Sequence, residues 1–206
     1  MEQIIVNGVV SAANYALIAL GLTLIFGILN FLNFAHGQMY MIGGFVVYYV
    51  YGIFGMNYFV ALLACAATLF VIGVAFETLF FRRVLSITKR EENSMLLAVG
   101  TALLLENVAL TLFGEKQRGV PPVVSGVYQI FGAYLPASRL LVLVLSALLV
   151  IALLLFVQYT KPGRAMRAVA QDKEVSLLMG VDVGRISALG FGISAALAGL
   201  AGGLLI

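Results

Sequence analysis

The stretch LLVLVLSALLVIALLLFVQYT, residues 140–160, contains no charged side chain and only a few polar ones. At a rise of about 1.5 Å per residue, roughly 20 apolar residues form a helix that crosses the hydrocarbon core of a bilayer. Backbone hydrogen bonds in lipid must close within the segment, and this favours a helix over an isolated extended chain. The stretch therefore predicts a membrane-spanning helix.

Five further apolar runs have the same character. They cover residues 4–29, 39–56, 58–81, 94–113 and 186–206. None alternates in the way that membrane barrel strands do. Of the 206 residues, 63% are hydrophobic and 10% are charged, against roughly 45–50% and 25% in soluble domains. The sequence thus predicts an all-α polytopic membrane protein with about six transmembrane helices. Because the last run reaches Ile206 without a cap or a charged flank, we expect the natural protein to continue.

The cations gather in two loops between apolar runs. Arg82, Arg83, Lys89 and Arg90 follow the third run, and Lys161, Arg164, Arg167, Lys173 and Arg185 follow the fifth. The excess of Lys and Arg in cytoplasmic loops places both on the cytoplasmic side. If every run spans once, the loop 114–138 and the N-terminus face outward. Alternatively, residues 30–38 form a break within the membrane. Cations in short loops indicate topology, so we expect no nucleic-acid partner.

Several kinds of chemistry are excluded by residue counts. The chain has one cysteine, Cys65, and one histidine, His36, so no metal site or internal disulfide is expected. No Gly-Lys dipeptide occurs, and without it there is no phosphate-binding Walker A loop. No Ser/His/Asp or paired-carboxylate arrangement can be assembled either. The sequence predicts a non-catalytic protein without a cofactor of its own.

The loop KPGRAMRAVAQDKEVSLLMGVDVGR, residues 161–185, carries the clearest functional pattern. Pro162 suits a helix start and Gly180 a helix stop. A small or apolar face, which alternates with charges, consists of Ala165, Ala168, Val169, Ser176 and Met179. This pattern predicts a short amphipathic helix that docks into a groove of a soluble partner. The alternative is an interfacial helix whose cations only follow the positive-inside rule.

Two stretches resemble a known family. GRAMRAVAQDKEVSLLMGVDVGRISALGFGISAALAGLAG, residues 163–202, resembles the cytoplasmic coupling loop and following helix of branched-chain amino-acid ABC permeases. YALIALGLTLIFGILNFLNFAHGQMYMIGG, residues 15–44, resembles the amino-terminal signature of the first, H-type, permease subunit. Two separate motifs in the right order make the resemblance specific. One departure is Val175-Ser176, where many relatives have an Ala-Ala pair.

The resemblance implies that residues 1–206 are one incomplete ABC permease transmembrane domain in a prokaryotic cytoplasmic membrane. Its implied partners are the lipid bilayer, a second permease subunit, two cytoplasmic subunits that hydrolyse ATP, and an external substrate-binding protein. Residues 161–185 would be the cytoplasmic coupling loop. The residues expected to face the ATPases are Gly163, Arg164, Arg167, Ala168, Asp172, Glu174 and Gly180. The implied substrates are leucine, isoleucine and valine. The alternatives are a urea or short-chain amide permease and an ion-coupled secondary transporter.

Polar residues at membrane depth are candidates for a pathway or gate, because such groups are costly unless they bond or line a wet cavity. One set, at the junction of the first two runs, consists of Asn30, Asn33, His36 and Gln38. The alternative is a capped turn near the interface. Glu106 and Asn107 lie inside the fourth run. Glu106 either binds a substrate ammonium group or forms structural hydrogen bonds. We favour the structural role, with Asn107 as one of its hydrogen-bond partners.

The last run carries small residues at four-residue spacing. Gly192 and Ala196 share one row, and Gly199 and Gly203 share another. Small residues at this spacing let helix backbones approach closely. The pattern predicts a helix-packing surface, either within the subunit or against a partner permease.

Overall fold

The computed structural model describes residues 2–29, 32–87, 91–116, 118–124, 126–130 and 133–206. Its elements are helical apart from one two-stranded sheet. In chain order they are α1 (Glu2–Leu29), α2 (His36–Val47), the π-helical turn η1 (Tyr48–Ile53), α3 (Tyr58–Phe76), the π-helical turn η2 (Glu77–Phe81), α4 (Arg82–Ile87), α5 (Glu91–Phe113), β1 (Val127–Ile130), β2 (Ala133–Pro136), α6 (Ala137–Tyr159), α7 (Lys161–Gln171), α8 (Lys173–Leu178) and α9 (Val183–Leu205).

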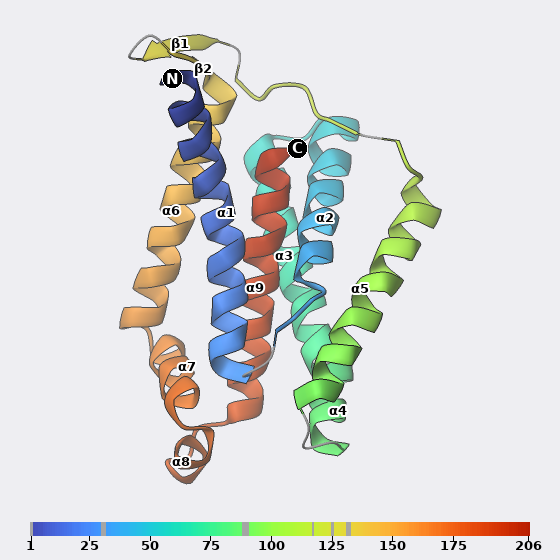
Figure 1. Ribbon diagram of the computed structural model, residues 1–206, viewed down its shortest axis with the longest axis vertical. Helices are drawn as coiled ribbons and strands as arrows, with labels where there is room; N and C mark the ends of the chain where they lie inside the picture. Colours follow the sequence, from blue (N-terminus) through green and yellow to red (C-terminus); the bar gives the residue numbers. More distant parts are fainter. Residues whose placement is uncertain (1, 30–31, 88–90, 117, 125, 131–132) are drawn as a thin grey trace.

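Five helices among the described residues are long and apolar enough to cross a membrane. They are Glu2–Leu29, Tyr58–Val84, Met95–Phe113, Ala137–Tyr159 and Val183–Leu205. The all-α membrane fold is therefore confirmed. The predicted second span, residues 39–56, is not among them: α2 and η1 together cover residues 36–53 and begin at the polar residues His36 and Gln38. In Figure 1, α2 begins partway along the bundle, whereas its neighbours run nearly the full length.

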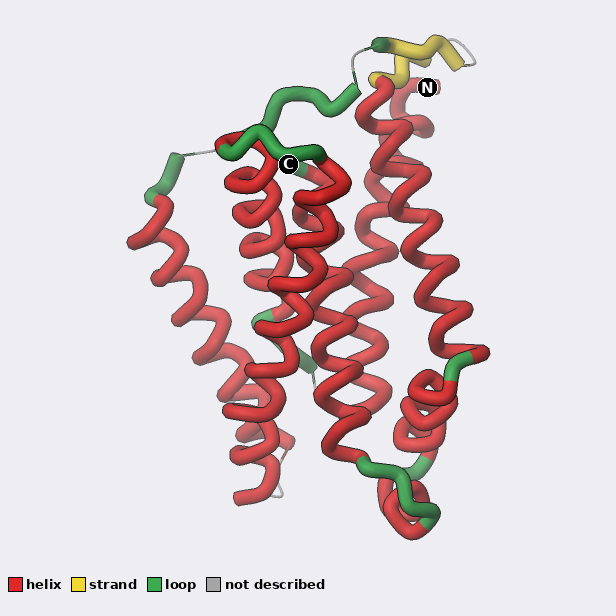
Figure 2. Tube along the Cα trace, turned by 180° about the vertical axis from the view of Figure 1, so that it is seen from behind, coloured by secondary structure: helices red, strands yellow, loops and turns green. Residues whose placement is uncertain are grey.

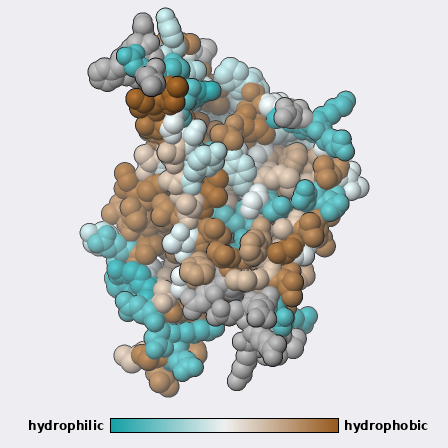
Figure 3. Space-filling model, in the orientation of Figure 1, coloured by the Kyte–Doolittle hydropathy of each residue, from teal (hydrophilic) through white to brown (hydrophobic). Residues whose placement is uncertain are grey.

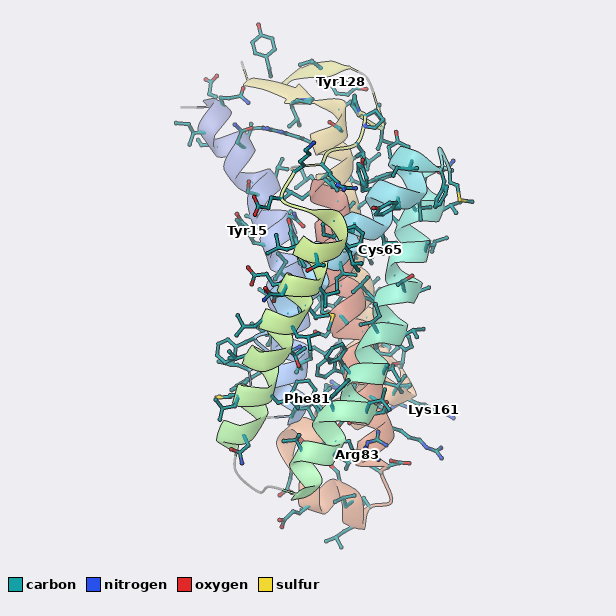
Figure 4. All side chains as sticks on the ribbon, turned by 90° about the vertical axis from the view of Figure 1, so that its right-hand side faces the viewer. Tyr15, Cys65, Phe81, Arg83, Tyr128 and Lys161 are labelled. Carbon is teal, nitrogen blue, oxygen red and sulfur yellow. The ribbon has the colours of Figure 1, made fainter. Side chains whose placement is uncertain are left out.

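The two ends of the bundle differ in charge. Figure 4 shows Arg83 and Lys161 at one end and Tyr128 of the hairpin at the other. The N-terminus, the hairpin and the end of α9 share the hairpin end, while α4, α7 and α8 lie at the cation-rich end (Figure 1). The cation-rich end is therefore cytoplasmic by the charge rule. Figure 2 shows loops at both ends, but the connection before α2 lies inside the bundle, as in the broken-helix alternative.

Helix α9 occupies the centre. In the most apolar 18-residue stretch of α9, 72% of the residues are buried, whereas the corresponding share in the other four spanning helices is 11–28%. It packs against α1, α2 and α3 through glycines on both sides of the contact. A Cβ on Gly73 would lie 2.7 Å from the Cβ of Ala195, and one on Gly43 would overlap the backbone of Gly199. Close backbone contact thus replaces interdigitated side chains here.

An antiparallel hairpin of β1 and β2, in which Tyr128 pairs with Leu135, lies at the external end above α1 and α6 (Figure 1). The hairpin is attached to the first turn of α1. The Gln3 side chain donates to the carbonyl of Tyr134 at 3.0 Å and accepts from its N–H at 2.9 Å. Arg139, at the start of α6, donates to the side-chain oxygen of Asn7. Residues more than 130 positions apart are therefore tied together at this end.

At the cation-rich end, Arg82 of α4 forms an ion pair with Glu77 of η2 and a hydrogen bond with the start of α9. Arg82 Nη2 lies 3.0 Å from Glu77 Oε2 and donates to the carbonyl of Gly184 at 2.8 Å. The Glu77 side chain is 3% exposed and that of Arg82 is 48% exposed. Beside them, the rings of Phe81 and Phe191 pack with centroids 5.1 Å apart. Arg82 thus compensates a buried carboxylate and anchors α9.

The ion pair gives a stability prediction. Arg82→Met leaves the Glu77 carboxylate buried without its partner, and we expect a loss of about 1–3 kcal/mol in the free energy of unfolding. The double variant Glu77→Leu with Arg82→Met removes both charges and should recover most of that loss. Thermal unfolding in detergent checks this. A double variant less stable than Arg82→Met alone would contradict the assignment.

Candidate functional site

Helix α7 is held firmly against the membrane helices. Thr160 caps it, because its hydroxyl accepts the N–H of Gly163 at 3.1 Å. Met166 and Val169 are buried in a cluster with Ile28. A Cβ on Gly163 would overlap the backbone of α6, so that residue permits the tight corner between α6 and α7. The buried face of α7 therefore packs inside the chain and is not free for a partner.

Two predicted coupling residues bond to the end of α6. Arg164 donates to the carbonyl of Tyr159 at 3.1 Å, and Arg167 donates to that of Gln158 at 3.2 Å. Cations at the last carbonyls of a helix complement its dipole and its unsatisfied acceptors. Both side chains remain exposed, and Ala168, which follows Arg167, is half-buried. Their geometry fixes the α6–α7 corner, and contact with an ATPase stays a prediction.

Helix α8 is short and sharply bounded. The side chain of Asp172 accepts the N–H groups of Glu174 and Val175 at 2.9 Å each, so Asp172 is its N-cap. Gly180 ends it with φ of +82°. Its N–H donates to Leu177, and the N–H of Val181 donates to Ser176, both at 3.0 Å. These two bonds form a Schellman motif, which favours glycine at this position. Glu174 is exposed in the first turn.

The tip of α8 is apolar and exposed. Its exposed apolar residues are Val175 (53%), Leu177 (54%), Leu178 (86%) and Met179 (80%). Figure 3 shows hydrophobic surface at this tip beside the hydrophilic surface of α7. An apolar patch at a water-facing end is typical of a protein interaction site. We call these four residues the α8 knob.

The α8 knob differs from the predicted docking face. That face included Val169 and Ser176, but Val169 is 3% exposed and Ser176 is 4% exposed. Val169 packs with α1 and α9, and Ser176 donates to the carbonyl of Asp172 at 2.7 Å. Leu177 and Leu178 were missed. The signal for them was a run of consecutive apolar residues in an otherwise charged loop.

The α8 knob connects directly to the central helix. Asp182 caps α9 by accepting the N–H of Arg185 at 3.0 Å and pairs with the Arg185 side chain at 2.9 Å. Two residues after the cap, the Gly184 carbonyl accepts from Arg82. The start of α9 therefore follows α8 closely in the chain and is bonded to Arg82 of α4.

At membrane depth, two of the predicted polar residues meet where α1, α2 and α9 adjoin. His36 Nε2 lies 3.1 Å from the carbonyl of Ile18, and Asn33 Oδ1 accepts the N–H of Ala35 at 3.1 Å. Both residues are buried, and within the described part of the chain His36 Nδ1 and Asn33 Nδ2 have no hydrogen-bond partner. Gln38 is half-buried, and Asn30 lies outside the described residues.

Glu106 and Asn107 are not part of this junction. Both are exposed on α5. Asn107 Nδ2 donates to the carbonyl of Leu103 at 2.7 Å, one turn earlier in the same helix. The Asn107 side chain therefore bonds to its own helix, and its bond does not go to Glu106 as predicted.

The four predicted packing residues lie on α9 with different exposures. Gly192, Gly199 and Gly203 are buried, and Ala196 is half-buried. Added Cβ atoms at the glycines would meet Phe70, Leu69 and Val47, respectively. The contacts of these glycines therefore lie within the chain.

Sequence reasoning missed a polar stripe on α1. Asn7, Ser11 and Asn14 recur at helical spacing on one face and line a cavity of about 500 Å³ at the external end. Arg139 and Tyr58 also line it. The signal in the sequence was the spacing of four and three residues between these polar side chains. An apolar helix has no structural need for polar residues at that spacing. Searching the described residues finds no group of three or more His, Cys, Asp or Glu side chains that suits a metal.

Comparisons with known proteins place this geometry in context. Residues 4–206 match the family model described as branched-chain amino acid transport system / permease component. The high-affinity branched-chain amino acid transport system permease protein LivH of Salmonella typhimurium is 31% identical to this chain. The match covers 97% of this chain and 68% of the length of LivH. BraD of Pseudomonas aeruginosa, described in the same words, is 31% identical over 98% of this chain and 70% of its own length. The probable branched-chain amino acid transport permease protein LivH of Methanocaldococcus jannaschii is 29% identical over 99% and 66%. No solved structure matches.

The cap of α8 gives a local prediction. Asp172→Ala removes the acceptor for the N–H groups of Glu174 and Val175, at a cost of about 1 kcal/mol. We expect hydrogen exchange of these amides in nanodiscs to become roughly fivefold faster, the factor that corresponds to that energy. Glu174→Ala, at the neighbouring exposed carboxylate, is the control and should leave the exchange rate of Val175 nearly unchanged. Equal exchange in both variants would contradict the capping role.

Proposed function

We propose that this chain, which belongs to the family of permease components of branched-chain amino acid transport systems, is the membrane subunit of an ATP-driven importer. It is a multi-pass protein of the prokaryotic cytoplasmic membrane. The substrates we propose are leucine, isoleucine and valine, because relatives from bacteria and an archaeon carry that description. Such subunits are generally non-catalytic, and the absence of a Gly-Lys dipeptide means that this sequence lacks a Walker A loop.

The partners we propose are a second permease subunit, two cytoplasmic ATPases and an external substrate-binding protein. The observation that carries the coupling role is the α8 knob, an exposed apolar surface at the cytoplasmic end. A groove on an ATPase that receives Leu178 and Met179 would bury side chains that are 86% and 80% exposed. Fully burying an apolar side chain of this size contributes roughly 1.5–3 kcal/mol.

The mechanism we propose is alternating access. ATP binding draws the two ATPases together, and their grooves move the α8 knobs of the two permeases. Each knob displaces α9, because the chain passes from Gly180 to the cap of α9 within two residues. Since α9 packs against α1, α2 and α3, its movement rearranges the membrane helices and opens the pathway outward.

Two alternatives make different demands on the chain. An ion-coupled transporter could use the predicted intramembrane carboxylate of Glu106, but Glu106 is exposed on α5, apart from the junction at His36. That placement favours the ATP-driven mechanism. A urea or amide permease shares the mechanism but not the cargo, and competition of labelled leucine uptake by urea distinguishes it.

Replacing a knob residue tests the coupling. Leu178→Asp puts a charge into the proposed interface at a cost of about 2 kcal/mol or more, so we expect ATP-driven leucine uptake to fall roughly thirtyfold. Uptake into proteoliposomes and copurification of the ATPases are the measurements, with membrane insertion unchanged. Val124→Asp, at a 40% exposed apolar residue of the external loop, is the matched control. Normal uptake with Leu178→Asp would refute the coupling role.

A further inference from the structure

The cavity at the external end combines three kinds of surface. Asn7, Ser11 and Asn14 of α1 form its polar side. Arg139 at the start of α6 contributes a cation, and its guanidinium donates to the Asn7 side chain. Its apolar lining includes Leu141, Val142 and Leu204. A small zwitterionic amino acid with an apolar side chain presents a carboxylate, an ammonium group and a hydrocarbon, which match these three surfaces.

Asn14 has the environment of a ligand-binding group. It is 2% exposed, and the hydroxyl of Tyr40 lies near its side chain, but among the described residues no bond of ordinary hydrogen-bond geometry reaches its amide nitrogen or oxygen. A buried amide without a partner costs about 1–3 kcal/mol. A purely structural asparagine would be bonded, as Asn107 is to Leu103. The amide of Asn14 therefore stays available to whatever enters the cavity that it lines.

The polar face of α1 continues inward from the cavity. One turn beyond Asn14, the carbonyl of Ile18 meets the ring of His36. One further turn on, the carbonyl of Gly21 accepts the hydroxyl of Ser194. Residues 7, 11, 14, 18 and 21 follow helical spacing on one face of α1. The face thus leads from the external cavity to the break before α2.

We propose that this cavity is an outward-facing site that the transported amino acid occupies before it passes the break at His36. Its carboxylate binds Arg139, the amide of Asn14 bonds to its polar head, and its side chain lies on Val142 and Leu204. This inference rests on the proposed function and adds the place where the cargo binds within the membrane subunit.

Thiol accessibility in the complete importer tests the site. In a Cys65→Ala background, Ser11→Cys places a thiol on the cavity wall, while Tyr15→Cys places one about one turn further along α1, at a residue that is 68% exposed and is not part of the cavity lining. A membrane-impermeant cationic methanethiosulfonate is added outside, with or without leucine and its binding protein. We expect Ser11→Cys to be modified, and leucine to slow that modification about tenfold, as for a site occupied most of the time. Tyr15→Cys should show no protection.

A second variant measures the contribution of the amide. Asn14→Leu keeps the approximate size but loses both polar atoms, so we expect leucine uptake about tenfold lower, the upper range for one hydrogen bond. ATPase stimulation by the binding protein should persist. Asn107→Leu on α5 is the control and should transport normally. If leucine does not protect Ser11→Cys and Asn14→Leu takes up leucine normally, the proposed site is wrong. If the unmutated complex imports no leucine with ATP, the proposed function itself is wrong.

Discussion

Everything else in the structure depends on the direct contact between the backbone of α9 and the backbones of α2 and α3. In lipid, apolar side chains gain little by leaving their surroundings, so helices associate through close packing and hydrogen bonds. Gly43 and Gly73 on one side and Gly199 and Gly202 on the other remove the side chains that would keep the helices apart. The same contact gives α9 its buried position at the centre of the bundle.

Much of this fold was predictable, because the bilayer imposes strong and local requirements. Length and apolarity identified the long helices, and the positions of Arg and Lys predict their direction. Pro162 and Gly180 marked a helix start and a helix stop through their own backbone preferences. The start of α2 was harder to predict, since the polar residues within 30–38 suit a surface turn as well as a break inside the bundle.

The site was less predictable, because its residues are defined by neighbours that are distant in sequence. Arg164 and Arg167 are cations in a docking loop by pattern, but their bonds go to the end of α6. Ser176 fits the small face of a helix by spacing, but it is buried beneath the α8 knob. Asn14 is one polar residue in an apolar run until α6 and α9 place a cavity against it. Local preference therefore defines the frame, and tertiary contacts assign the roles.

The position of α9 has a consequence for how the protein is made. Ser194 bonds to Gly21 across 173 residues, and Gln3 bonds to Tyr134 across 131. The ribosome therefore delivers α1, α2 and α3 to the membrane long before their central helix exists. During that interval the glycine surfaces and Asn14 have none of their final neighbours. The insertion machinery, or transient contacts among the early helices, has to shield these groups from lipid until synthesis reaches the last part of the chain described here.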